Sequence, residues 1–140
     1  MNNTKILPYL HFNGDCKEAM EFYKKCFGET NVKLTMSTYG ESPVPVSEDD
    51  KSKIMHAQFE YKNILFMASD AMPGTTVTTG KNVDLSLNGD DLEGITKVFN
   101  ALAEGGKVEM PLEKQFWGDT FGMLKDKFGI NWMVNISQAK

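Results

Sequence analysis

Apolar and polar residues alternate over residues 6–12, and from about residue 16 to residue 27 apolar residues recur every three or four positions. Alternation with period two predicts a β-strand, and the wider spacing predicts a helix with one buried face. Three further strand-like segments follow, at residues 32–39, 54–61 and 64–69. The first half of the chain therefore predicts the order β-α-β-β-β.

The second half repeats this order. A period-two segment at residues 83–87 precedes a helical stripe from about residue 91 to residue 104, and three strands are predicted at residues 108–112, 120–125 and 130–136. We expect an α+β fold in which residues 1–140 form a single domain. Its two tandem units span approximately residues 5–69 and 82–137.

A short sequence motif occurs once in each half of the chain and marks the duplication. Asn13-Gly14-Asp15-Cys16-Lys17-Glu18 is echoed by Asn88-Gly89-Asp90-Asp91-Leu92-Glu93, and each copy stands between a predicted strand and a predicted helix. Asp15 and Asp90 suit the N-cap position, where a carboxylate accepts a hydrogen bond from the first helical turn. Glu18 and Glu93 then suit the third helical position of a capping box.

Composition narrows the class of protein. The chain has 140 residues, 41% of them hydrophobic, and a formal net charge of −4. No basic cluster points to nucleic acid or to an anionic membrane surface. No apolar run is long enough for a membrane span, and the first residues lack the apolar core of a signal peptide. We expect a cytoplasmic protein.

The two cysteines fit that compartment. Cys16 and Cys26 lie ten residues apart in one predicted helix, which separates their Cα atoms by roughly 15 Å. This distance exceeds the reach of a disulfide. They are predicted to be reduced thiols that pack the helix, with a nucleophilic role as the alternative.

Several motifs carry a family resemblance. They are Pro8-Tyr9-Leu10-x-Phe12-x-Gly14, Ala19-x-x-Phe22-Tyr23-x-x-x-Phe27-Gly28, Met55-His56-Ala57, Ser69-Asp70, Gly105-Gly106-Lys107-Val108, Met110-Pro111-Leu112, Phe116-Trp117-Gly118 and Asp126-x-Phe128-Gly129-x-x-Trp132. With the doubled β-α-β-β-β order, the chain resembles the PhnB-like branch of the vicinal oxygen chelate superfamily, which includes glyoxalases, extradiol dioxygenases and bleomycin- or fosfomycin-resistance proteins. The resemblance implies a homodimer and no defined reaction.

In metal-using relatives, the resemblance places ligands on the first and last strands of each unit. The matching positions here are Leu7 or Pro8, Met67, Asn82 and Met133. These are not the His or carboxylate side chains that usually hold a divalent ion. We therefore expect no metal cofactor.

Strand alternation separates a face covered by a helix from a face open to ligand. On residues 130–136 the apolar positions suit the helix side, which leaves Met133 on the open side. The same reasoning gives the candidate ligand-binding side chains: Tyr9, His11, His56, Gln58 and Asp84, above an apolar floor of Met67 and Met133.

Two functions remain open at this point. One is a small-molecule-binding protein without a metal, and the other is an enzyme, an isomerase or lyase or a metal-dependent member of the superfamily, that uses His56 as a general base or a ligand. A triad of His11, His56 and Glu60 or Asp84 is the metal-binding alternative. Solvated positions at a dimer surface are the alternative without function.

Two further features have alternative interpretations. Trp117 forms either a wall of the ligand site or a plug in the core. The polar loop at residues 40–53 is either a lid over the first unit or a surface insertion.

Overall fold

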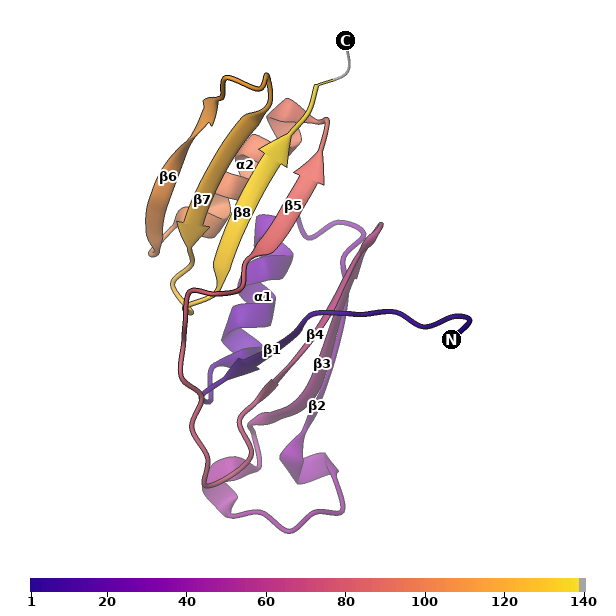
Figure 1. The fold of residues 1–140 in the computed structure, drawn as a ribbon. Helices are drawn as coiled ribbons and strands as arrows, with labels where there is room; N and C mark the ends of the chain where they lie inside the picture. The colour runs from indigo at the N-terminus through magenta and orange to yellow at the C-terminus, as the bar shows by residue number, and fades with distance from the viewer. Residues whose placement is uncertain (139–140) are drawn as a thin grey trace. The chain divides into compact units, whose positions relative to one another are not determined.

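The structure is a computed structural model that describes residues 1–138. The chain divides into two compact units, Met1–Thr78 and Thr79–Lys140, and each is described by itself. Each unit contains one helix and a four-stranded sheet, connected in the order β-α-β-β-β (Figure 1). The α+β fold class and the order of elements predicted from the sequence are confirmed.

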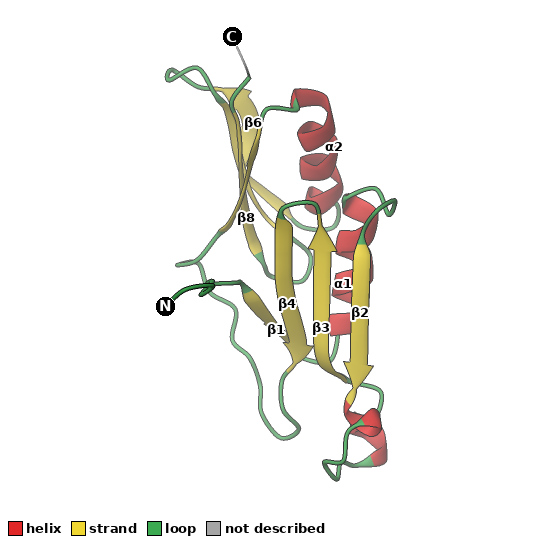
Figure 2. Cartoon of the chain, turned by 90° about the vertical axis from the view of Figure 1, so that its right-hand side faces the viewer, coloured by secondary structure: helices red, strands yellow, loops and turns green. Residues whose placement is uncertain are grey.

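The first unit contains β1 (Tyr9–Phe12), α1 (Cys16–Cys26), β2 (Lys33–Thr38), β3 (Ile54–Tyr61) and β4 (Ile64–Asp70). Its sheet has the order β1-β4-β3-β2. β1 runs parallel to β4, and the other neighbours are antiparallel. Figure 2 shows the strands in front of α1, so the helix covers one face of this sheet and leaves the other without a helix.

The first strand begins later than predicted. Alternation suggested a start at Ile6, but Ile6 is 98% exposed and β1 begins at Tyr9. Pro8 has no N–H to donate to a neighbouring strand, although its carbonyl accepts a hydrogen bond from the N–H of Met67 at 3.0 Å. Proline therefore marks the beginning of the ladder.

The polar loop at residues 40–53 is more regular than its composition suggested. It contains two short 3₁₀ helices, η1 (Tyr39–Glu41) and η2 (Glu48–Asp50). The N–H of Gly40 donates to the carbonyl of Lys51 at 2.9 Å, which closes the loop on itself. A role as a lid stays a prediction.

The second unit contains β5 (Leu85–Gly89), α2 (Leu92–Ala103), β6 (Lys107–Lys114), β7 (Thr120–Lys125) and β8 (Asn131–Ile136). Its sheet order, β5-β8-β7-β6, repeats that of the first unit. α2 packs against β6, β7 and β8. A Cβ at Gly122 would lie 3.0 Å from the Phe99 ring, so glycine allows the helix to approach the strand closely.

Aromatic side chains fill the core between α1 and the first sheet. Phe59 and Phe66 stack with ring centroids 4.6 Å apart, and Tyr23 meets Phe66 edge-on at 6.0 Å. All three side chains are buried. Burying one such side chain contributes roughly 1.5–3 kcal/mol, so this cluster attaches the helix firmly to one face of the sheet.

Asp15 is the N-cap residue of α1, as predicted, but the predicted hydrogen bond is wrong. Its side chain makes no cap hydrogen bond, so no capping box forms there. Instead, Oδ1 of Asp70 accepts from the N–H groups of Gly14 and Cys16 at 2.8 and 2.9 Å. Oδ2 of Asp70 accepts from the N–H of Ile54 at 2.8 Å. A buried carboxylate at the end of β4 therefore joins the start of α1 to the start of β3.

The predicted cap of α2 is displaced by one residue. The N-cap is Asp91 rather than Asp90, and Oδ1 of Asp91 accepts from the N–H of Gly94 at 3.0 Å. Glu93, predicted as part of a capping box, lies 3.5 Å from the ammonium group of Lys97 instead. The aspartate directly before the helix occupies the cap because its carboxylate reaches the third N–H.

Both cysteines are buried thiols that form no disulfide, as expected from their spacing. Burial, together with smaller contributions from the nearby carboxylates of Asp70 and Asp15, raises the pKa of the Cys16 thiol to about 12. A thiol that stays protonated is a poor nucleophile. The packing role is therefore favoured over the nucleophilic one.

Across residues 1–138, every helix is too short or too polar to span a lipid bilayer.

Candidate functional site

The open face of the first sheet carries the predicted polar cluster. Leu10 and Phe12 of β1 are buried, whereas Tyr9 and His11 are exposed, so these two side chains point away from α1. On β3, Ala57 and Phe59 are buried, whereas His56 and Gln58, the residue directly before each of them, are half-buried. We call this surface, formed by Tyr9, His11, His56, Gln58 and Met67, the first open face.

Tyr9 connects the histidines of the first open face. Its hydroxyl lies 3.2 Å from Nδ1 of His56, within hydrogen-bonding distance. The Tyr9 ring lies 5.0 Å from the His11 ring and 5.8 Å from the His56 ring, measured between centroids. The rings of Tyr9, His11 and His56, from β1 and β3, therefore form one aromatic cluster with the Tyr9 hydroxyl and the imidazole nitrogens as its polar atoms.

The strand register adds an amide and a thioether to this group. Tyr9 pairs with Met67 across β1 and β4, and Met67 pairs with Gln58 across β4 and β3. Paired residues project from the same face of a sheet. The Tyr9 ring, the Met67 thioether and the Gln58 carboxamide thus form one row beside His56. This row is suited to a ligand with a flat apolar body and a polar substituent.

The register also gives the cross-strand partners of Met67 and Met133. The partner of Met67 is Tyr9, not Leu7 or Pro8, which precede β1. In the second unit the partner of Met133 is Ser86, whereas Asn82 precedes β5. Neither the Tyr9–Met67 pair nor the Ser86–Met133 pair contains an imidazole or a carboxylate. Within residues 1–138, no three His, Cys, Asp or Glu side chains gather as a metal group, so the alternative triad of His11, His56 and Glu60 in the first unit does not assemble.

Asp84 and Met133 belong to the corresponding open face of the second sheet. Met123 of β7 pairs with Met110 of β6 and with Met133 of β8, so three methionines form a row across the sheet. A cavity of about 270 Å³ opens beside this row. Its lining residues are Lys81, Asp84, Glu109, Met110, Met123, Leu124 and Asn131.

The sequence analysis missed most of this cavity. Of its lining residues it had singled out Asp84 alone. Met110 and Met123 were missed because they lie on β6 and β7, the second and third strands of this unit along the chain, and faces were assigned there only for the first and last strands. The alternation around the buried Gly122 and Leu124 could have placed Met123 on the open side.

Trp117 lies in the turn between β6 and β7 and is 49% exposed, which excludes a plug in the core. Its ring meets Phe116 at 5.0 Å and Phe121 at 6.0 Å. Nearby, hydrogen bonds from Asn135, Ser137 and Trp117 lower the pKa of the Asp119 carboxyl. Trp117 therefore lies next to a carboxylate that the sequence analysis did not single out, and its role as a wall of the ligand site stays a prediction.

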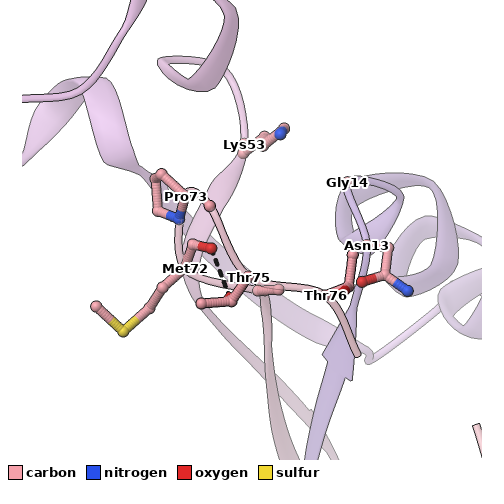
Figure 3. A pocket seen from close by; sticks show the side chains of 9 residues that line it. Asn13, Gly14, Lys53, Met72, Pro73, Thr75 and Thr76 are labelled. Atoms are coloured by element: carbon pink, nitrogen blue, oxygen red, sulfur yellow. Dashed lines mark hydrogen bonds between the residues drawn. The ribbon is translucent and has the colours of Figure 1, made fainter. Parts of the chain in front are cut away.

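A smaller cavity of about 150 Å³ lies at the end of β1 and β4 (Figure 3). The Asn13 side chain binds both the carbonyl and the N–H of Val77, at 2.9 and 2.7 Å. Lys53 forms an ion pair of 2.8 Å with Asp50, which raises the pKa of the Lys53 ammonium group. The polar groups of Asn13 and Lys53 already bond to other residues of the first unit, namely Val77 and Asp50. This cavity is therefore a weaker candidate for a ligand site than the open faces.

Comparison with known proteins places the chain in a family. A family model described as 3-demethylubiquinone-9 3-methyltransferase matches residues 4–135. The chain belongs to this family. Protein YjdN of Escherichia coli strain K12 is 30% identical, over 94% of each chain. Protein PA1353 of Pseudomonas aeruginosa is 43% identical, with a TM-score of 0.86 that covers 98% of this chain and 100% of that one.

The PhnB protein of Bacillus cereus is 29% identical, with a TM-score of 0.74 over 96% of this chain and 100% of that one. The resemblance to the PhnB-like branch is thus confirmed. A glyoxalase/bleomycin resistance protein of Albidiferax ferrireducens, at 15% identity and a TM-score of 0.60, shares the fold alone. No reaction follows for this chain from the family's name, because one fold can host many chemistries.

Proposed function

We propose that this protein binds a small organic molecule on the first open face, with the Tyr9–His56 pair as its polar anchor. The observation that carries the proposal is the 3.2 Å contact between the Tyr9 hydroxyl and Nδ1 of His56, on a face where both rings remain accessible. Tyr9 is 38% exposed, although it is a large side chain in a strand. An exposed aromatic group with hydrogen-bonding edges is typical of a binding surface.

The side chains define the chemical class of the ligand. The Tyr9 and His11 rings and the Met67 thioether offer flat, polarisable surface. His56 and Gln58 add hydrogen-bonding groups beside it. We therefore propose a flat, ring-containing ligand that carries a hydroxyl or carbonyl group.

The proposal does not require a metal ion, because Tyr9, Met67 and Gln58 offer a phenol, a thioether and a carboxamide, not the imidazole and carboxylate donors that usually hold a divalent ion. Titration with zinc, nickel and iron tests this part. Weak binding that His56→Ala leaves unchanged is expected. Stoichiometric, tight binding that His56→Ala abolishes would overturn it.

Calorimetric titration with a panel of planar phenols, quinones and aromatic carbonyl compounds tests the ligand site. Tyr9→Phe removes only the hydroxyl and should weaken the best ligand about fivefold, the effect of one hydrogen bond. Tyr61→Phe is the matched control, because Tyr61 packs against Phe27 on the helix side of the same sheet. Equal effects of the two substitutions, or none from Tyr9→Phe, would contradict the site.

The same contact favours an enzyme as the second candidate. Tyr9 holds the His56 ring through Nδ1, and Nε2 would then exchange a proton with a bound carbonyl compound. Exchange of carbon-bound protons into deuterated water, followed by NMR, tests this function. Catalysed exchange that disappears in His56→Ala would support a general base, and exchange unaffected by that substitution would exclude it.

We further propose that the protein is a cytoplasmic homodimer. The buried thiols of Cys16 and Cys26, which form no disulfide, support a reducing compartment. Exposed apolar side chains support self-association; among them Ile6 is 98% and Phe116 96% exposed. Light scattering at micromolar concentration should give twice the chain mass of 15.7 kDa, and the mass of one chain would contradict the dimer.

A further inference from the structure

The cavity in the second unit combines apolar walls with unpaired charges. Met110 and Met123 supply adjacent thioethers from β6 and β7. Asp84 and Glu109 bring two carboxylates to the same opening, and Lys81 brings one ammonium group. We propose that this cavity binds an organic monocation with an apolar body, such as a quaternary or aryl-alkyl ammonium compound. The side chains of this cavity all belong to the second unit, and none of them belongs to the first open face.

The charge of the lining favours a cation. Two carboxylates and one ammonium group leave the opening with a net negative charge. The ion pairs found among residues 1–138 join Lys51 to Glu48, Lys53 to Asp50 and Lys97 to Glu93. Asp84 and Glu109 thus have no basic partner in this part of the chain, and their field remains available to a ligand.

The walls favour an organic cation over a metal ion. A thioether is a soft, weakly polar group that packs against apolar and polarisable surface. A hard metal ion needs several oxygen ligands, and no such group of side chains assembles within the described residues. A cation with its charge spread over alkyl or aryl carbon can contact the methionines and remain near the carboxylates.

Hydrogen bonds hold one edge of the cavity in place. Nδ2 of Asn131 donates to the carbonyl of Gly80 at 2.8 Å and to that of Val83 at 3.2 Å. These bonds fix the segment that carries Lys81 and Asp84 against the beginning of β8. The volume of about 270 Å³ lies near the lower end of ligand pockets, at roughly 300 Å³, which suits a molecule of one ring and a small head group.

Methionine-methyl NMR of the full chain, titrated with benzyltrimethylammonium, tests the proposal. Benzyl alcohol and benzenesulfonate serve as the neutral and anionic probes of similar size. We expect saturable shifts of the Met110 and Met123 methyl signals with the cation. The methyl signal of Met20, which is buried in the first unit, should not move. The neutral probe should bind at least fivefold more weakly, and the anion should not saturate.

Charge-removing variants complete the test. Asp84→Asn combined with Glu109→Gln should weaken cation binding about tenfold and leave the neutral probe unchanged. Glu104→Gln is the matched control, because Glu104 is an exposed carboxylate at the end of α2. The proposal is overturned if the neutral probe binds as well as the cation, if the double variant binds like the control, or if the Met110 and Met123 signals do not respond. Each result is independent of Tyr9 and His56, so it separates this site from the one proposed above.

Discussion

At the scale of single residues, the Asp70 carboxylate joins three backbone positions of the first unit. Its side chain is 2% exposed and accepts hydrogen bonds from three backbone N–H groups. The sequence motif Ser69-Asp70 indicated family resemblance but not this role, because the three donors belong to segments 16 to 56 residues away. Local sequence rules describe caps within one turn of the helix, so they assigned the cap to Asp15.

Asp70→Ala should therefore lower the free energy of unfolding by about 3 kcal/mol or more, since each buried donor left unpaired costs about 1–3 kcal/mol. Asp15→Ala is the control and should cost less than about 0.5 kcal/mol, as is usual for a position without specific contacts. Urea denaturation measures both values. A loss from Asp15→Ala as large as that from Asp70→Ala would contradict the assignment of the main capping role to Asp70.

The Cys16 thiol makes stability depend on pH. Its folded-state pKa is raised to about 12, above the unfolded value of about 8.5. The neutral thiol is therefore favoured by folding, and its contribution is fully present below about pH 8.5 and is lost as the pH rises toward 12. The free energy of unfolding should fall between pH 9 and pH 11 more steeply in the native sequence than in Cys16→Ala. Parallel curves would contradict the raised pKa.

At the scale of elements, the repeated motif shows which structural positions an alignment of the two halves predicts correctly and which it does not. Asn13 and Gly14 follow β1, whereas Asn88 and Gly89 belong to β5, so the two copies of the motif occupy different structural positions. The helices begin at Cys16 and Leu92, and alignment on the motif had placed the second start one residue earlier. Helix caps depend on single positions, so this difference moved the predicted cap from Asp91 to Asp90.

The strand faces were nonetheless assigned correctly. Tyr9 pairs with Met67, and in the second unit Ser86 pairs with Met133 in the same way. Alignment of the two copies of the motif had instead matched Tyr9 with Asp84. Ser86 and Asp84 differ by two residues, and side chains two apart share a face of a strand. The sequence could therefore predict which side chains point to the open faces, but it could not predict which of them contact one another across strands.

The displaced cap gives a direct test at this scale. Asp91→Ala should destabilise the protein by about 1 kcal/mol, the usual value of an N-cap side chain. Asp90→Ala, at the adjacent exposed position, should change the free energy of unfolding by less than about 0.5 kcal/mol. Thermal denaturation of both variants measures the difference. A larger effect of Asp90→Ala would show that Asp90 is the N-cap residue, as the motif predicted.

At the scale of the whole molecule, each unit has one helix on one face of a four-stranded sheet and leaves apolar side chains on the other face. Chains below roughly 70–80 residues rarely gain enough from one such core to fold alone. For this reason we propose that residues 1–140 form a single domain, although the contacts within the chain divide it into two compact units.

Differential scanning calorimetry tests this proposal. We expect one transition whose calorimetric and van't Hoff enthalpies agree, because neither unit should be stable without the other. Asp91→Ala, located in the second unit, should then shift the whole transition. Two separated transitions, with only one affected by Asp91→Ala, would show two independent domains.

The central claim is that the first open face binds a ligand through Tyr9 and His56, and the histidine side chains report on it directly. The chain has only two histidines, His11 and His56, so their ring signals in a ¹⁵N NMR spectrum can be assigned by one substitution. During titration with the best planar ligand of the panel, both ring signals should shift and saturate, with about fivefold weaker binding in Tyr9→Phe. Saturable binding that leaves both ring signals unchanged would contradict the claim.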